Sequence, residues 1–111
     1  MAAVEYERRE RIGVITLNRP EARNAVNGDV ATAMEAAIDA MEADEDVWVG
    51  VLRAETAGQE RPVFCAGADL KALNAGQGAA LNTARGGFAG FVYRARRKPI
   101  IAAVDGLATA G

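Results

Sequence analysis

The chain has 111 residues, which suits one domain or part of one, and thirteen basic against fifteen acidic side chains leave a net charge of −2. A single cysteine, Cys65, and the lack of histidine exclude an intramolecular disulfide, the usual zinc sites and any histidine-based catalytic triad. The sequence offers no broad basic field to attract a nucleic acid.

The N-terminal segment predicts a β-hairpin followed by a loop. Val4 to Arg9 alternates apolar and charged side chains, and Ile12 to Asn18 is rich in β-branched residues. Pro20 disfavours helix at the preceding residue, so a polar loop follows. The charged start has no apolar core of signal-peptide length, and no apolar run approaches the ~20 residues that span a bilayer. We therefore expect a cytoplasmic protein.

A helix and a strand are predicted next. From Asn27 to Met41 apolar residues recur at helical spacing, which predicts a helix of about four turns with Asn27 as its N-cap. The acidic run 44–46 opposes the negative end of a helix dipole, so we expect the helix to stop near Ala43. The apolar run Val47 to Leu52 predicts a strand buried on both faces, as in parallel sheets covered by helices.

The second half of the chain predicts two short strands and two helices. Residues 62–64 resemble a strand, 65–68 a tight turn and 69–73 the first turn of a helix. Apolar spacing from Leu81 to Ala95 predicts a second long helix, which three glycines weaken by up to ~1 kcal/mol each. Ile100 to Val104 predicts a short buried strand. This order of elements indicates a layered α/β core.

Two of the predicted turns consist of small residues. Cys65 to Asp69 (CAGAD) and Ala103 to Gly111 (AVDGLATAG) each follow an apolar run. Either turn alone indicates no more than a glycine that permits a tight bend. Parallel strands, however, bring their carboxyl ends to one side of a sheet, so the two turns together suit a pair of converging N–H donors. An enolate or a tetrahedral oxyanion requires such a pair.

Three motifs resemble, in order, those of the crotonase superfamily, the enoyl-CoA hydratase/isomerase family. They are LNRPEARNAV (Leu17–Val26), FCAGADLK (Phe64–Lys71) and KPIIAAVDGLATAG (Lys98–Gly111). The resemblance covers residues 1–111, essentially the whole chain, but only the N-terminal part of the family's domain. It implies the N-terminal half of an α/β crotonase-like (ClpP/crotonase) spiral of ββα units, a partial acyl-CoA-binding domain without the C-terminal part of the family domain.

The resemblance also implies roles for individual residues. The N–H groups of Ala68 and Gly111 would be the two oxyanion-hole donors that hold the carbonyl of an acyl-CoA thioester. Arg23 matches a position where the family often carries a basic residue near the coenzyme A phosphates, and a solvated loop arginine is the alternative. Lys71 is a candidate phosphate contact or a plain surface charge. The candidate substrate-binding residues are therefore Arg23, Ala66 (near the adenine), Ala68, Asp69, Leu70, Lys71 and Gly111.

The implied activity is acyl-CoA binding with stabilisation of a thioester enolate, most commonly for hydration of a 2-enoyl-CoA in fatty-acid oxidation. No cofactor or metal is implied, because coenzyme A is part of the substrate. Isomerase, hydrolase and dehalogenase chemistry share the oxyanion hole and stay open. The family commonly forms trimers or hexamers, which makes a homo-oligomer a further expectation.

The catalytic glutamates of the family's hydratases follow the second oxyanion glycine, and this sequence ends there. Glu55 and Glu60 match no catalytic position, and Cys65 has no histidine to activate it. The resemblance therefore implies that this form is catalytically deficient. The alternative function is a non-catalytic truncated coenzyme A-binding or interaction module, which would bind a partner through apolar surface left bare.

Overall fold

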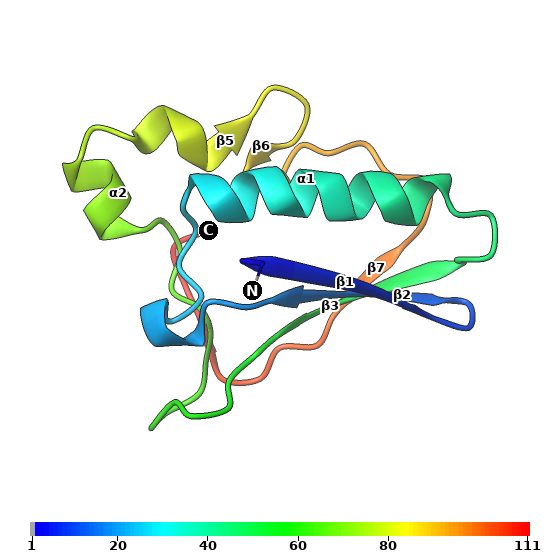
Figure 1. The fold of residues 1–111 in the computed structure, drawn as a ribbon, viewed down its shortest axis with the longest axis horizontal. Helices are drawn as coiled ribbons and strands as arrows, with labels where there is room; N and C mark the ends of the chain where they lie inside the picture. Colours follow the sequence, from blue (N-terminus) through cyan, green and yellow to red (C-terminus); the bar gives the residue numbers. More distant parts are fainter. Residues whose placement is uncertain (1) are drawn as a thin grey trace.

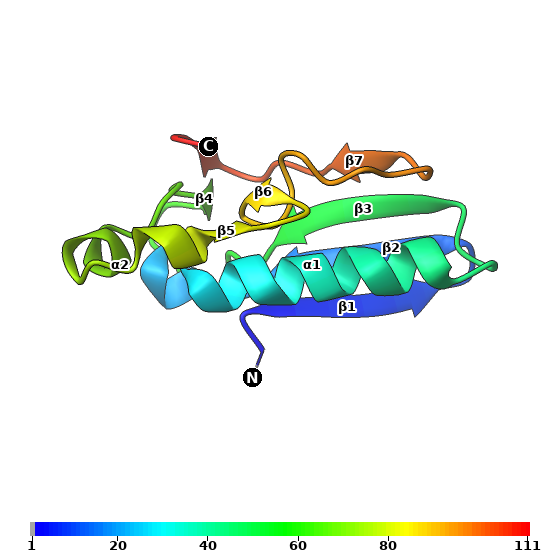
Figure 2. The ribbon, with the colours of Figure 1, turned by 90° about the horizontal axis from the view of Figure 1, so that it is seen from above.

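A four-stranded sheet with one long helix packed along it forms the larger part of the molecule (Figure 1). The computed structural model describes residues 2–111. The first two strands pair antiparallel and the other pairs are parallel. Figure 2 shows the strands in the order β1, β2, β3 and β7. Their bounds are Val4–Arg9 for β1, Ile12–Leu17 for β2, Val49–Ala54 for β3 and Ile100–Ala102 for β7.

Helix α1 (Gly28–Ala43) confirms the predicted helix, including its N-cap and its end. The side chain of Asn27 accepts a hydrogen bond from the N–H of Val30 at 3.0 Å, which gives one of the unpaired donors of the first turn a partner. The apolar stripe of α1 faces the sheet, and Met34, Ile38 and Met41 are fully buried together with Ile15 of β2. Burial of each such side chain contributes about 1.5–3 kcal/mol.

Strand β3 begins two residues later than predicted and is not buried on both faces. Gly50, Leu52 and Ala54 are buried, whereas the side chains that alternate with them are only half-buried. The face of β3 toward α1 is packed, and the opposite face is only partly covered. An uninterrupted apolar run does not distinguish the two faces, so the prediction of burial on both faces is wrong. The hairpin β1–β2 confirms its prediction, with Val4 opposite Leu17.

The long helix predicted between Leu81 and Ala95 is wrong. This segment forms a 3₁₀ turn, η2 (Gly78–Leu81), and the two-residue strands β5 (Asn82–Thr83) and β6 (Gly87–Phe88). Gly90 has a positive φ of 66°, and a Cβ there would collide with the carbonyl of Ala31 in α1. The apolar side chains of this segment therefore contact α1 from a compact loop and not from a helix. Arg85 of the same loop forms ion pairs with Glu35 and Asp39 of α1, at 3.1 and 2.8 Å.

A second, two-stranded sheet lies beside the end of the main sheet. Strands β4 (Val63–Cys65) and β8 (Leu107–Ala108) pair in parallel, and the short helix α2 (Leu70–Asn74) follows β4. The strand predicted to be buried at 100–104 is shorter and mostly exposed, and it is the edge strand of the main sheet, with no strand among residues 2–111 paired to its outer edge. Ile101 at its centre is 60% exposed.

Candidate functional site

The two turns of small residues meet at the paired ends of β4 and β8. Cys65 lies opposite Ala108 in the parallel register, and the N–H of Thr109 donates to the carbonyl of Cys65 at 3.0 Å. Gly67 has a φ of +87°, and a Cβ built there would lie 2.9 Å from the carbonyl oxygen of Thr109 and would overlap the carbonyl of Ala110. A glycine is required at position 67 on both counts. The two turns therefore meet in the structure, through strand β8, which lies inside the segment predicted as a turn.

The backbone of the first turn is held against the loop that follows the hairpin β1–β2. The N–H of Ala66 donates to the carbonyl of Arg23 at 3.1 Å, and the N–H of Asp69 donates to the carbonyl of Val26 at 2.8 Å. Between them, the N–H of Val26 donates to the carbonyl of Gly67 at 2.7 Å. The loop and the turn therefore run side by side as a short parallel bridge, Val26 opposite Ala68.

This bridge determines where the N–H of Ala68 points. In a trans peptide the C=O and the following N–H point in opposite directions. Because the carbonyl of Gly67 faces Val26, the N–H of Ala68 faces away from the loop, and it donates no hydrogen bond to any residue of the described range 2–111. A neighbouring donor is already used, since the N–H of Gly67 lies 3.4 Å from the Sγ of Cys65. Ala68 is the free donor of this turn.

Gly111 ends the second turn in a conformation that suits glycine. Its φ is +130°, and a Cβ there would lie 2.6 Å from the Cε2 atom of Phe88 in β6. Ala110 before it also has a positive φ, of 52°. Phe88 therefore packs directly against Gly111, which ties the β5–β6 loop to the site.

Two residues that the sequence analysis did not single out organise the loop. Asn24 is 1% exposed, and its Nδ2 donates to the carbonyls of Glu55 and Val63 at 3.1 and 3.2 Å. Its Oδ1 accepts from the N–H of Arg19 at 2.8 Å. The side chain of Arg19 donates to the carbonyl of Ala25 at 2.6 Å. Both residues lie within the quoted motif LNRPEARNAV, which is the signal that could have identified them.

Both carboxylate oxygens of Asp69 have partners within the protein. One carboxylate oxygen accepts from the N–H groups of Lys71 and Ala72 at 2.9 and 3.3 Å, which caps α2, and the other pairs with Arg19 at 3.2 Å. Burial alone would raise the pKa of Asp69, but these backbone donors and the Arg19 guanidinium outweigh it and hold that pKa below its ordinary value. Of the other two candidates on α2, Leu70 is 71% exposed and Lys71 is exposed.

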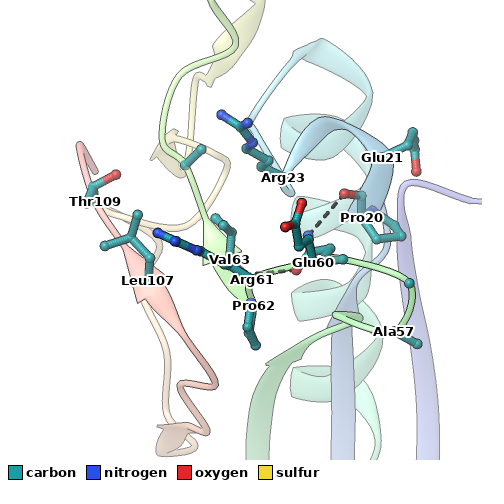
Figure 3. A pocket seen from close by; sticks show the side chains of 13 residues that line it. Pro20, Glu21, Arg23, Ala57, Glu60, Arg61, Pro62, Val63, Leu107 and Thr109 are labelled. Atoms are coloured by element: carbon teal, nitrogen blue, oxygen red, sulfur yellow. Dashed lines mark hydrogen bonds between the residues drawn. The ribbon is translucent and has the colours of Figure 1, made fainter.

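An open groove beside the two turns is lined by the remaining two candidates. Arg23 and Ala66 line it together with Arg61, Leu107 and Thr109, and its volume is about 1140 Å³. Figure 3 shows Arg23 and Arg61 projecting from two different segments, with Leu107 and Thr109 along another side. Gln59 joins two of the segments, because its side chain donates to the carbonyl of Pro20, in the 3₁₀ turn η1 (Pro20–Ala22), and accepts from the N–H of Val63.

Two kinds of feature are missing from residues 2–111. That range holds no group of three or more His, Cys, Asp or Glu side chains placed to bind a metal ion. It also contains no helix with the length and apolar character needed to cross a membrane.

The family model described as enoyl-CoA hydratase/isomerase matches residues 7–111. The chain belongs to this family. A probable enoyl-CoA hydratase of Rhizobium meliloti (strain 1021) is 42% identical over 110 residues, which cover 95% of this chain and 39% of that protein. The short-chain-enoyl-CoA hydratase of Clostridium acetobutylicum is 35% identical over 115 residues, covering 97% of this chain and 41% of that one.

Solved structures of this family share the fold. An enoyl-CoA hydratase from Mycobacterium tuberculosis H37Rv superposes with a TM-score of 0.81 at 39% identity, over 96% of this chain and 39% of that chain. A carnitinyl-CoA hydratase from Mycobacterium avium gives 0.79 at 42% identity, over 96% and 40%. The crotonase-type α/β fold inferred from the motifs is confirmed. The chain spans about two fifths of the length of these relatives.

Proposed function

We propose that this member of the enoyl-CoA hydratase/isomerase family binds an acyl-CoA thioester and polarises its carbonyl between the N–H groups of Ala68 and Gly111. The observation that carries the proposal is the orientation of the Ala68 N–H. This group faces away from the loop that follows β2, and its turn lies beside the turn that ends in Gly111. The names of the relatives, which are hydratases of enoyl-CoA, favour hydration of a 2-enoyl-CoA as the reaction of the family member.

The chemistry explains why two amide donors matter. When the oxygen of water adds to C3 of a 2-enoyl thioester, the electron pair of the C2–C3 double bond moves toward the carbonyl and leaves an enolate. The negative charge then sits on the thioester oxygen. Donors fixed in advance stabilise that charge without reorganisation, and the loss of one such donor typically costs about 3 kcal/mol in the barrier.

The groove supports the coenzyme A part of the proposal. The guanidinium groups of Arg23 and Arg61 offer donors and positive charge to phosphate groups. The small side chain of Ala66 leaves room beside the turn for a flat base. The exposed ammonium of Lys71 on α2 is a further candidate for phosphate contact.

Proton transfer is the step for which we assign no residue of this chain. The carboxylate of Glu55 pairs with Arg53 at 3.6 Å, and Glu60 lines the groove on the loop before β4. Neither belongs to the two turns. We therefore propose that the 111-residue form binds the thioester without hydrating it. Purified chain should leave the enoyl-thioester absorbance of crotonyl-CoA unchanged, and steady hydration free of contaminating enzyme would overturn this part.

Calorimetric titration tests the binding proposal. Acetyl-CoA should bind about ten-fold more tightly than an S-ethyl thioether of coenzyme A, which lacks the carbonyl oxygen that two hydrogen bonds would hold. Ala68→Pro, which removes the N–H, should abolish that preference. Arg23→Gln should weaken both ligands by about five-fold and leave the preference intact. Equal affinity of the unsubstituted chain for both ligands would refute the proposal.

An interaction module is the second candidate function. Ile101, Val104 and Leu107 are 60%, 55% and 57% exposed on one C-terminal segment. Exposed apolar side chains that are contiguous mark interaction surfaces more often than isolated ones do. A chain that binds neither coenzyme A ligand but associates through this segment would support this candidate.

A further inference from the structure

We propose that Arg19 is a positioning residue of the oxyanion site, whose charge acts on the Ala68 N–H through two aligned peptide groups. The inference rests on the proposed function, because it concerns the same donor. It follows from three hydrogen-bonded groups that lie in series: the Arg19 guanidinium, the peptide that joins Ala25 to Val26, and the peptide that joins Gly67 to Ala68. We call the two peptide groups the peptide relay.

The series can be followed bond by bond. Arg19 Nη1 donates to the carbonyl of Ala25 at 2.6 Å. The other end of that peptide is the N–H of Val26, which donates to the carbonyl of Gly67 at 2.7 Å. The other end of the second peptide is the N–H of Ala68. Both peptide dipoles therefore point the same way, with a cation at their carbonyl end and the free donor at the far end.

This arrangement strengthens the donor. A cation at a carbonyl oxygen draws electron density toward that end of the peptide, so the N–H at the other end becomes a better donor. Hydrogen bonds in a chain polarise one another, by about 10–30% per bond in the condensed phase. The Arg19 side chain is only 20% exposed, so water screens its charge less than that of a surface arginine.

The surroundings keep Arg19 in place. Its guanidinium also pairs with Asp69, whose carboxylate is 12% exposed and caps α2. The backbone of Arg19 forms two hydrogen bonds with Asn24. The Arg19 N–H donates to the Asn24 side chain, and the Asn24 N–H donates to the Arg19 carbonyl, each at 2.8 Å. A role in loop stability alone would not require the Arg19 guanidinium to donate to the Ala25 carbonyl, which belongs to the first peptide group of the relay.

The test compares Arg19→Met and Arg19→Lys in the full 111-residue chain. The readouts are the infrared stretching frequency of the ¹³C-labelled thioester carbonyl of bound acetyl-CoA and the acetyl-CoA over thioether preference. Arg19→Met should reduce the downward frequency shift and lower the preference about five-fold. Arg19→Lys, which keeps the charge, should restore part of both. Affinity for coenzyme A itself should stay within two-fold, roughly the scatter of surface substitutions.

Two control variants separate polarisation from stability. Ile38→Val removes a methylene group from the core of α1, outside the peptide relay and the groups that hold Arg19, so it should lower the urea midpoint and leave the carbonyl frequency unchanged. Arg9→Gln removes a cation from an exposed pair with Glu7 and should change neither. If Arg19→Met does not fold, Arg19→Gln decides, because glutamine carries no charge and can still donate to the loop. A carbonyl frequency and a preference in Arg19→Gln equal to those of the unsubstituted chain would overturn the peptide relay.

The carbonyl frequency distinguishes failure of the Arg19 role from failure of the proposed function. A full carbonyl shift and an unchanged preference in folded Arg19→Met would overturn the role of Arg19 and leave the proposed function standing. The lack of any carbonyl shift in the unsubstituted chain would overturn the proposed function, and the role of Arg19 with it.

Discussion

Gly67 lies in close contact with the second turn. Its positive φ and the carbonyls of Thr109 and Ala110 both act against a side chain. We predict that Gly67→Ala lowers the free energy of unfolding by about 2–4 kcal/mol, since a strained backbone and a close contact add. Gly58→Ala is the matched control, because Gly58 has a φ of +82° with no heavy atom within 4 Å.

Urea denaturation of the two variants measures the difference. Gly58→Ala carries the cost of the left-handed backbone alone, about 1 kcal/mol. Equal losses in both variants would show that the approach of the second turn contributes nothing to stability.

Helix α1 is the element that organises the core, and its N-cap can be tested separately. Asn27→Ala removes the hydrogen bond to the N–H of Val30 and should lower the free energy of unfolding by about 1 kcal/mol. The helical circular dichroism at low urea should be unchanged, because the buried stripe still holds the helix on the sheet. Asn82→Ala, at an exposed position, is the control, and a loss of the same size there would contradict the capping role.

The elements also show where sequence patterns suffice. The helix at 28–43 and the hairpin at 4–17 were predicted because periodicity, turn and cap agree at each of them. The segment from Leu81 to Ala95 has apolar spacing of the same kind, yet Gly90 must lie against the Ala31 carbonyl and Arg85 must reach α1. These are tertiary contacts, and no local pattern encodes them.

Prediction of the candidate site was similarly divided. The two turns were located from small residues after apolar runs, but strand β8, which pairs with β4 and brings them together, lies inside the segment predicted as a turn and was not predicted. The roles of Arg19 and Asn24 depend on bonds to residues up to 50 positions away in the sequence. A polar loop of that composition has no periodicity from which such bonds can be inferred.

At the scale of the whole molecule, charge pairing predicts sensitivity to acid. The pKa values of Asp39, Glu42 and Asp69 are lowered in the folded chain, by the Arg85 guanidinium at Asp39 and, against an opposing effect of burial, by backbone N–H groups at the other two. The unfolded chain therefore binds more protons between the folded and unfolded pKa values, which favours unfolding. This stabilisation is complete above about pH 5 and is lost as the pH falls below about 4.

Urea midpoints at several pH values check this prediction. The midpoint should fall between pH 5 and pH 3, and Glu42→Gln should lower it at pH 7 and flatten the acid limb. Glu5→Gln is a suitable control, because Glu5 lies on the exposed face of β1. A midpoint that is constant from pH 5 to pH 3 would contradict the role of these carboxylates.

The exposed C-terminal segment predicts self-association of the purified chain. The outer edge of β7 has no partner strand within the described residues, and its Ile101 is 60% exposed. Such edges pair with other chains unless charges block them. Sedimentation should show concentration-dependent association that Ile101→Lys reduces, whereas Ile12→Lys, at an isoleucine on β2 that is 39% exposed, should not. A monomer at every concentration would exclude association.

The donor at Ala68 belongs to the main chain, and this affects how the site responds to its environment and to mutation. An amide neither gains nor loses a proton in the physiological range, so its contribution to ligand affinity should be flat with pH while the stability of the scaffold is not. Any small residue at position 68 provides the same group. Replacement of side chains that line the groove can therefore alter what the proposed site binds, while position 68 still supplies its N–H group.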